Sequence, residues 1–137
     1  MGVLFGVVAL PALAQWNPAR PIRIVVPYPP GGGSDLAARM ISERMSPKLG
    51  QTVVVENRPG TGGILGADAV YRAEPDAYTL LLGASDAISI APHLQPELTK
   101  YRSEEFTAVA PVKLLTTILV TRPGLNSPTI LFMAKSL

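Results

Sequence analysis

Two glycine-rich turns contain the residue types from which an anion-binding site can be built. The first spans residues 27–35 and reads Pro-Tyr-Pro-Pro-Gly-Gly-Gly-Ser-Asp; the second spans residues 57–63 and reads Asn-Arg-Pro-Gly-Thr-Gly-Gly. Glycine lets backbone N–H groups come close to a ligand, and the N-terminus of a helix favours negative charge. Because each turn follows an apolar strand pattern and precedes a helical one, we expect the two turns to line one anion-binding crevice.

The spacing of the glycines argues against a nucleotide as the anion. A P-loop requires a lysine after its last glycine, and no lysine follows either turn. The dinucleotide fingerprint G-x-G-x-x-G also fails, because counting from Gly60 and Gly62 its third glycine is replaced by Leu65. His93 is the only histidine and there is no cysteine, so a metal site or a catalytic triad would rest on one residue. We therefore predict no catalytic residue, no metal and no cofactor.

Several side chains in the turns allow two interpretations each. Asp35 and Asp86 either form a pair of carboxylates in one crevice or each caps a helix, and capping is favoured. Tyr28 either stacks over a ligand or covers its own loop. Arg58 either holds a ligand carboxylate with two hydrogen bonds or pairs with Glu56.

A hydrolase or transferase is the alternative class of function. It would use Ser34 or Ser85 as the nucleophile with a carboxylate, but the sequence offers no positioned general base. The net charge is only +2 and lysine and arginine form no cluster, so the sequence predicts no nucleic-acid partner.

Three strand patterns position these turns. Residues 22–26, 53–55 and 79–82 are short apolar runs, and each is followed by a turn and then by a helical pattern. The third turn, residues 83–86, reads Gly-Ala-Ser-Asp. Alternating strands and helices predict a parallel sheet with right-handed crossovers, in which ligands bind beyond the carboxyl ends of the strands. All three turns are expected at that edge.

The helices between the strands also have predicted ends and faces. The first is expected to begin with Ser34 as its N-cap and to end at Leu49-Gly50, since Pro47 disfavours helical geometry at Ser46. Its predicted face toward the sheet is Leu36, Met40 and Ile41, and its predicted solvent face is Arg39, Glu43 and Arg44. The second helix is predicted over residues 64–73 with Ile64, Ala67 and Tyr71 on one face, and a third short helix ends before Pro92.

The size of the chain and its two ends complete the prediction. With 137 residues, 47% of them hydrophobic and 16% charged, there is room for one folded domain. Residues 1–14 are predicted to be a signal peptide, because an apolar run ends in Ala-Leu-Ala before Gln15, although no basic residue precedes it; the alternative is a buried strand or helix. Residues 106–115 and 117–121 are predicted strands, and residues 129–137 the start of a helix.

The motifs resemble those of the Bug family, the substrate-binding proteins of tripartite tricarboxylate transporters. The matching segments are residues 21–35, 49–63, 66–68, 75–81 and 105–107. The resemblance implies an α/β fold like that of type II periplasmic binding proteins, with a mostly parallel sheet flanked by helices. Residues 15–125 would form the N-terminal part of the first lobe, and residues 126–137 would begin the hinge or second lobe, truncated there.

The resemblance also implies a function. A periplasmic protein of this kind captures a small carboxylate (a dicarboxylate, tricarboxylate, acidic amino acid or aromatic acid) between two lobes and delivers it to membrane transporter subunits. Backbone amides of the turns and ordered water would hold the ligand, and the full-length protein would be a monomer. Carried over to this sequence, the ligand-binding residues would be Tyr28, Gly31, Gly32, Gly33, Ser34, Asp35, Thr61, Gly62, Gly63, Ala84, Ser85 and Asp86.

Three features depart from the family pattern. Ala77 takes the place of a glycine, and a positive φ there would cost on the order of 1 kcal/mol. Ser85-Asp86 replaces a turn that is usually uncharged, and an aspartate facing the site would repel a carboxylate. The chain is also less than half the usual length, so a truncated remnant with little binding is the alternative. From the chain alone we expect at most millimolar affinity.

Overall fold

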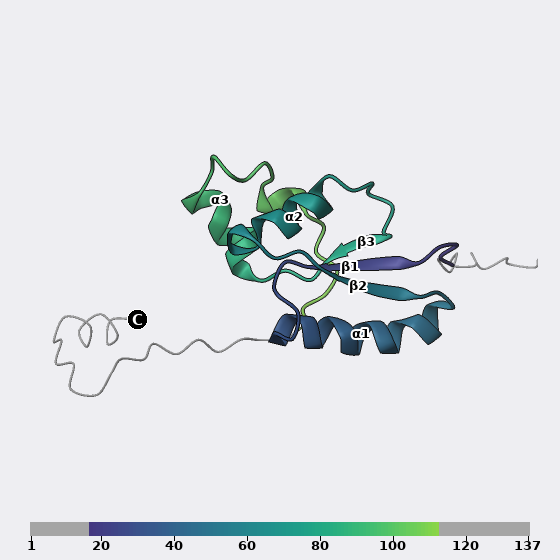
Figure 1. The fold of residues 1–137 in the computed structure, drawn as a ribbon. Helices are drawn as coiled ribbons and strands as arrows, with labels where there is room; N and C mark the ends of the chain where they lie inside the picture. Colours follow the sequence, from purple (N-terminus) through teal and green to yellow (C-terminus); the bar gives the residue numbers. More distant parts are fainter. Residues whose placement is uncertain (1–16, 113–137) are drawn as a thin grey trace, which may run out of the picture.

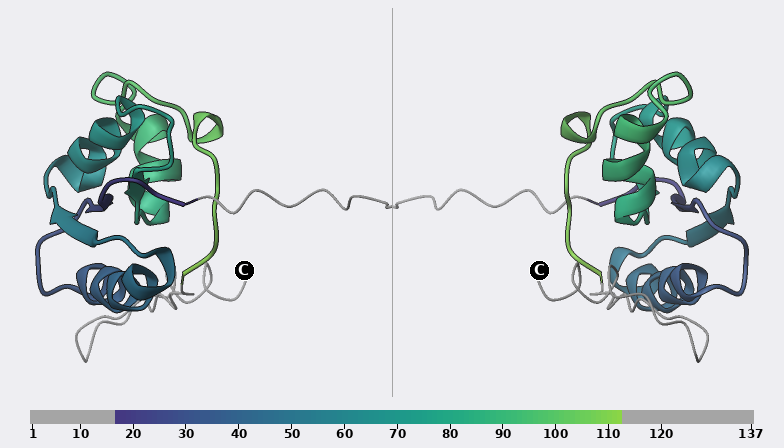
Figure 2. Two further views of the ribbon diagram at one scale, coloured as in Figure 1. Left: turned by 90° about the vertical axis from the view of Figure 1, so that its right-hand side faces the viewer. Right: turned by 90° about the vertical axis from the view of Figure 1, so that its left-hand side faces the viewer.

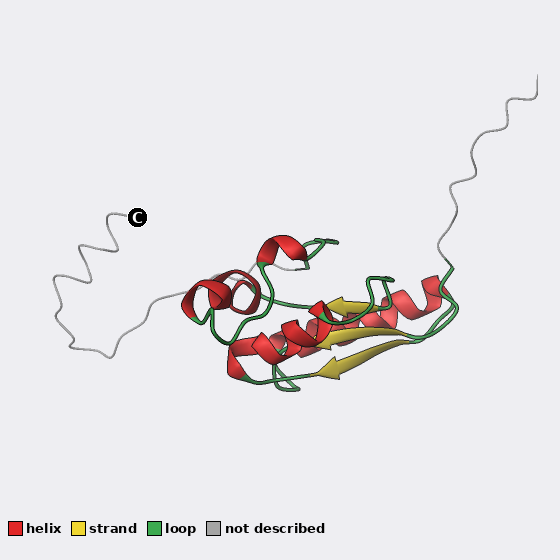
Figure 3. Ribbon diagram, turned by 90° about the horizontal axis from the view of Figure 1, so that it is seen from above, coloured by secondary structure: helices red, strands yellow, loops and turns green. Residues whose placement is uncertain are grey.

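Three parallel strands form the centre of the computed structural model, which describes residues 17–112. They are β1 (Ile22–Val26), β2 (Val53–Asn57) and β3 (Thr79–Leu81), in the order β2-β1-β3. Ile24 of the central strand lies opposite Val55 on one side and Leu80 on the other. Figure 3 shows the three arrows pointing the same way. The predicted parallel sheet is confirmed, and its strand ends differ from the prediction by at most two residues.

Helices cover both faces of the sheet. The long helix α1 (Gly33–Leu49) lies along one face, while α2 (Ile64–Tyr71) and the short α3 (Ala91–Leu94) lie on the other (Figures 1 and 2). The core between α1 and the sheet consists of residues that are at most 6% exposed: Ile22, Ile24, Val26, Ala38 and Val53. A second cluster beneath α2 contains Ile64, Ala67 and Tyr101. No helix within residues 17–112 is long and apolar enough to cross a membrane.

The face that α1 turns toward the sheet differs from the predicted one. Leu36 and Met40 are 56% and 58% exposed, so two of the three predicted contact residues face outward. Ala38 is fully buried, and Ile41 packs against the same core together with Met45 and Leu49. A small residue at position 38 lets the helix backbone approach the strands, so the buried stripe runs through Ala38 rather than Leu36. The predicted solvent face is confirmed for Arg39, Glu43 and Arg44.

Only the C-terminal end of α1 was predicted correctly. Its N-cap is Gly32, not Ser34, because the helix already begins at Gly33. At the other end Gly50 adopts a left-handed φ of 64°, as expected for a glycine after a helix. Pro47 lies inside the helix; the hydroxyl of Ser46 donates a hydrogen bond to the carbonyl of Ser42 at 2.8 Å just before it.

After β3 the chain departs further from the prediction. The short helical segment η2 (Asp86–Ile90) continues directly into α3, so Pro92 lies within a helical run and does not end it. Proline has no N–H to donate to the preceding turn, and the carbonyl of Ala87, five residues before Pro92, accepts the Tyr101 hydroxyl at 2.6 Å instead. Residues 106–112 are not a strand; a short turn, η3 (Ser103–Glu105), precedes them. The predicted signal peptide, the strand at residues 117–121 and the helix at 129–137 lie outside the described residues.

Candidate functional site

The turns that follow β1, β2 and β3 meet at the carboxyl edge of the sheet. Gly63 of the second turn fits between the other two, since a Cβ atom there would lie 2.8 Å from the Cβ of Ala87 and 3.4 Å from that of Pro27. The side-chain amide of Asn57 donates a hydrogen bond to the carbonyl of Tyr28 at 3.1 Å. The Tyr28 hydroxyl in turn donates one to Asp86 Oδ1 at 2.5 Å. The three turns that were predicted to lie at one edge of the sheet are therefore in contact with one another.

Asp35 holds the first turn in shape. It is 2% exposed, and its Oδ2 atom accepts hydrogen bonds from the Gly31 N–H at 2.8 Å and from Arg39 Nε at 3.0 Å. Gly31 has a φ of 84°, which glycine adopts without strain. The hydrogen bonds from Arg39 and Gly31 lower the pKa of Asp35 to about 2. Asp35 is therefore an ionised carboxylate that fixes the loop preceding the helix, and it neither pairs with Asp86 nor caps α1.

The N-terminus of α1 lies in the first of these turns, where Gly32 and Gly33 are exposed to solvent. Among the described residues, no side chain accepts a hydrogen bond from its first turn, and the N-cap Gly32 contributes no side chain. The first N–H groups of a helix lack partners within it and carry partial positive charge. The N–H of Gly31 already donates to Asp35, so the backbone N–H groups of this turn that are available to a ligand begin at Gly32.

The second turn has an unusual backbone. Thr61, Gly62 and Gly63 have positive φ angles of 48°, 62° and 92°. The Gly63 N–H donates to the carbonyl of Gly60 at 2.9 Å, so it supports the turn itself. Thr61 and Gly62 are exposed at the surface.

Arg58, beside this turn, forms an ion pair with Glu56. This contact is the main reason that the pKa of Glu56 is lowered. Of the two interpretations of Arg58, the structure shows the pair with Glu56, so this guanidinium is not a free anion binder.

The third turn brings Ala84, Ser85 and Asp86 to the same edge. Asp86 is exposed, and besides Tyr28 its Oδ1 atom accepts the N–H of Ala87 at 2.9 Å. Burial, followed by this hydrogen bond to Asp86, raises the pKa of Tyr28. Tyr28 is thus a link between the first and third turns.

Asn57 was not singled out from the sequence, although it joins two of the turns. The signal for it was a polar side chain at the end of a buried strand, where its amide can reach the neighbouring loop. Arg39 was likewise predicted only to face water, yet it pairs with Asp35.

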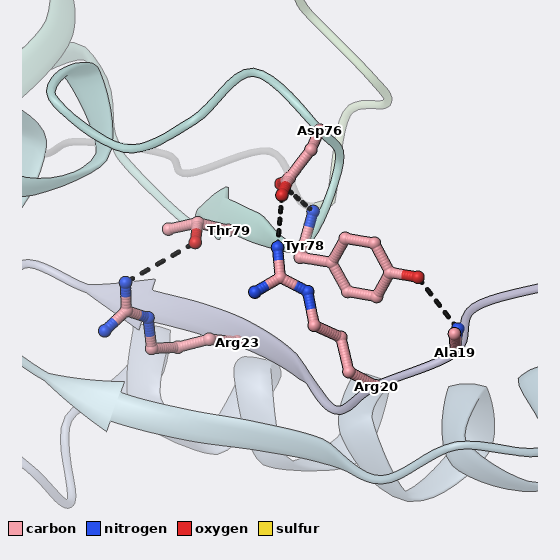
Figure 4. Close-up of polar contacts among 6 residues, drawn as sticks. All are labelled: Ala19, Arg20, Arg23, Asp76, Tyr78 and Thr79. Atoms are coloured by element: carbon pink, nitrogen blue, oxygen red, sulfur yellow. Dashed lines mark hydrogen bonds and ion pairs between the residues drawn. The ribbon is translucent and has the colours of Figure 1, made fainter.

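A hollow lies at the opposite edge of the sheet. Figure 4 shows polar contacts of several residues that line it. It is lined by Arg20, Arg23, Arg72, Glu74, Asp76, Tyr78 and Thr79, among others. Arg20 pairs with Asp76 and lies 4.4 Å from the centre of the Tyr78 ring, and Arg23 contacts Glu56 at 3.2 Å and Thr79 at 3.4 Å. Arg72 pairs with Asp68 at 2.8 Å. Because acidic side chains already neutralise its arginines, this hollow is a poor anion site.

Comparison with known proteins identifies the relatives of this fold. A family described as "Tripartite tricarboxylate transporter family receptor" matches residues 37–131. Protein BugT of Bordetella pertussis is 41% identical over 120 residues, which are 87% of this chain and 37% of BugT. The chain spans about a third of the length of the relatives it matches.

Solved structures agree with the sequence comparison. MatC from Rhodopseudomonas palustris, solved with bound malate, is 41% identical with a TM-score of 0.64, covering 69% of this chain and 32% of MatC. A structure described as a periplasmic transporter is 43% identical with a TM-score of 0.60, covering 63% of this chain and 29% of that one. The described residues therefore have the fold of a part of periplasmic binding proteins.

Proposed function

Because the chain belongs to the tripartite tricarboxylate transporter receptor family, which includes the Bug proteins, we propose that it captures a small carboxylate at the crevice between its three turns. The observation that carries this proposal is the open N-terminus of α1 at the point where the turns meet. Helix N-termini favour anions, and ligands of open parallel sheets bind beyond the carboxyl ends of the strands. The malate bound to MatC is a carboxylate of the proposed kind.

The proposed binding residues are those of the three turns, with two kinds of role. Gly32, Gly33, Ser34, Thr61 and Gly62 present backbone atoms to the ligand. Asp35, Gly31 and Gly63 are spent on internal hydrogen bonds and hold the turns in place. Tyr28, Ala84, Ser85 and Asp86 form the side of the crevice beyond β3.

The proposed setting is the periplasm, reached through a signal peptide at residues 1–14, with delivery of the ligand to membrane subunits of the transporter. Support for this setting comes from the family and from its periplasmic relatives. A protein of this class binds and releases its ligand without chemical change.

Calorimetry of the 137-residue chain with citrate, succinate, glutamate and benzoate tests the proposal. We expect a Kd of about 1 mM or weaker, because the described turns enclose only one side of a ligand. Micromolar affinity would show that the chain encloses more of a ligand than one side. The absence of binding to all four acids would contradict carboxylate capture by this chain.

A single backbone donor can be removed to locate the site. Gly33 is the first helical residue, where proline is tolerated, and Gly32 before it has φ −76° and ψ 167°, which suits a residue before proline. Gly33→Pro should therefore keep the fold, lose one N–H and weaken binding by about tenfold, since hydrogen bonds to charged groups are worth about 1.5–3 kcal/mol. Gly33→Ala is the matched control, because it retains the N–H and should bind as the parent does.

A further inference from the structure

We propose that Tyr101 is a positioning residue of the proposed site. Its hydroxyl holds the third turn against the other two turns by supplying the hydrogen bond that Pro92 cannot donate. The inference rests on the proposed function, because it assigns a further residue to the same site. It follows from a loosely wound helical turn after β3, from a missing backbone donor and from a buried contact between distant segments.

The helical segment η2 (Asp86–Ile90), which begins in the third turn, is wound more loosely than an α-helix. At its end the N–H of Ala91 donates to the carbonyl of Asp86, which lies five residues earlier instead of four. In this register the next residue, Pro92, would donate to the carbonyl of Ala87, but proline has no N–H. The register therefore leaves the Ala87 carbonyl without its backbone donor, which is costly in a buried segment.

Tyr101 supplies the missing donor from a segment 14 residues further along the chain. Its hydroxyl donates to the Ala87 carbonyl at 2.6 Å, and the residue is only 2% exposed. Its ring packs edge to face on Phe106, with the ring centres 5.4 Å apart, so the hydroxyl is held in place. Burial and the charges of Asp68 and Asp86 raise the pKa of Tyr101, so the hydroxyl keeps its proton and donates it.

The residue that Tyr101 holds joins the third turn to the other two. Ala87 is fully buried, and a Cβ atom at Gly63 of the second turn would lie 2.8 Å from its Cβ. The preceding residue, Asp86, accepts the hydrogen bond from Tyr28 of the first turn at 2.5 Å. A movement of Ala87 would change both contacts together. Tyr101 therefore acts on the site through Ala87.

Loss of the hydroxyl would favour a different winding of this segment. In the ordinary α-helical register the N–H of Ala91 donates to the carbonyl four residues earlier, which is that of Ala87. This register gives the carbonyl a backbone donor and removes the need for Tyr101. It also turns Asp86 and Ala87 relative to the sheet, and so takes them out of their contacts with the first and second turns.

Tyr101→Phe tests the proposal, because it removes the hydroxyl and keeps the ring. In the ¹⁵N-labelled 137-residue chain without ligand, we expect the NMR resonances of Gly63 and Ala91 to shift. The Kd for succinate, measured by NMR titration, should rise by about two- to tenfold, the factor by which one neutral hydrogen bond shifts a local equilibrium. A hydrogen bond that only stabilised the fold would leave the Kd of the folded chain unchanged.

Tyr71→Phe is the matched control. Its ring lies 6.2 Å from that of Tyr101 in the same aromatic cluster, and its hydroxyl makes no hydrogen bond within residues 17–112. The same loss of a hydroxyl should therefore leave the resonances of Gly63 and the Kd for succinate as in the parent.

Pro92→Ala provides a rescue, because it restores the backbone donor that the segment lacks. An N–H at residue 92 can donate to the Ala87 carbonyl in the observed register, with or without the Tyr101 hydroxyl. Tyr101→Phe made in the Pro92→Ala background should therefore leave the Kd for succinate nearly unchanged. Pro92→Ala alone should bind succinate as the parent does.

The outcomes separate this inference from the proposed function. If Tyr101→Phe binds succinate as tightly as the parent, or if Tyr71→Phe weakens binding equally, the positioning role is wrong and carboxylate capture stands. If Pro92→Ala does not reduce the effect of Tyr101→Phe, the hydroxyl does not replace a missing N–H and the inference is overturned. If succinate shifts no resonance of the three turns in the parent, the proposed function fails, and the ligand-free shifts of Gly63 and Ala91 in the variants decide the role of Tyr101.

Discussion

Ala77 occupies a backbone conformation that residues other than glycine rarely adopt. Its φ is 67°, and the Asp76 carboxylate on one side accepts the N–H of Tyr78 at 3.0 Å on the other. The hydrogen bond across the turn holds Ala77 in the left-handed region, where the Cβ atom crowds the following carbonyl. The positive φ considered from the family pattern is therefore present, and the alanine is strained.

Replacing Ala77 by glycine should relieve that strain. We expect Ala77→Gly to raise the free energy of unfolding by about 1 kcal/mol, after allowing for the greater freedom of glycine in the unfolded chain. Urea denaturation followed by circular dichroism measures the change. Ala69→Gly in the middle of α2 is the control, and there the same substitution should lower stability by about 1 kcal/mol. A loss of stability in both variants would contradict the strain at Ala77.

At the level of elements, Gly66 lets α2 pack directly on the first turn. A Cβ atom at this position would lie 2.6 Å from the Cβ and 2.8 Å from the Cα of Pro27, and 3.1 Å from the carbonyl oxygen of Arg58. Two of these neighbours are backbone atoms, which cannot turn away. This contact fixes the position of α2 over the turn that follows β1.

Gly66→Ala should therefore destabilise the fold although alanine is the better helix former. Overpacking of this kind costs about 1–3 kcal/mol, more than the roughly 1 kcal/mol that helix propensity returns. The midpoint of urea unfolding reports the difference. Gly32→Ala serves as the matched control, because its φ is −76° and the nearest atom to a Cβ, the Pro29 carbonyl oxygen, is at 3.5 Å. Equal stability of the two variants would mean that the helix can shift away from Pro27.

The elements that the sequence predicted best are those with a local cause. Residues 22–26 are a short apolar run between two prolines, and this strand was predicted at its observed bounds. The predicted buried face of α1 was wrong at Leu36 and Met40. Their large apolar side chains dominate the hydrophobic pattern of the sequence, whereas close packing of the helix on the sheet favours the small residue Ala38. The helix that contains Pro92 was predicted to end before it, because proline usually ends a helix; the hydrogen bond from Tyr101 to the Ala87 carbonyl joins residues that are 14 apart in the sequence.

The meeting of the three turns could be predicted from the sequence, but the side-chain contacts between them could not. Parallel strand order brings the three turns together, and that much follows from alternating strands and helices. The contacts of Asn57 with Tyr28, and of Tyr28 with Asp86, join segments that are 29 and 58 residues apart. Such pairings depend on how the loops fold back, which no spacing in the sequence encodes.

On the scale of the whole molecule, Asp35 is the one buried charged residue in the part of the chain that the structure describes. It lies under the first glycine turn, one helical turn before Ala38 of the core, and pairs with Arg39 at 3.0 Å. Its protonation therefore couples global stability to the shape of the proposed site.

The sign of this coupling follows from the lowered pKa. The pKa of Asp35 falls from 3.8 to about 2 on folding, so its contribution to stability is complete above pH 3.8 and is lost as the pH falls through about 2. Urea unfolding of the parent chain and of Asp35→Asn should therefore differ most above pH 3.8, and the difference should shrink steadily toward pH 2. Arg39→Gln removes the main cause of the shift, so the loss of stability on acidification should be smaller than in the parent and should end at a higher pH. Parallel pH profiles for all three proteins would contradict the hydrogen bonds assigned to Asp35, and with them its role in holding the first glycine turn in shape.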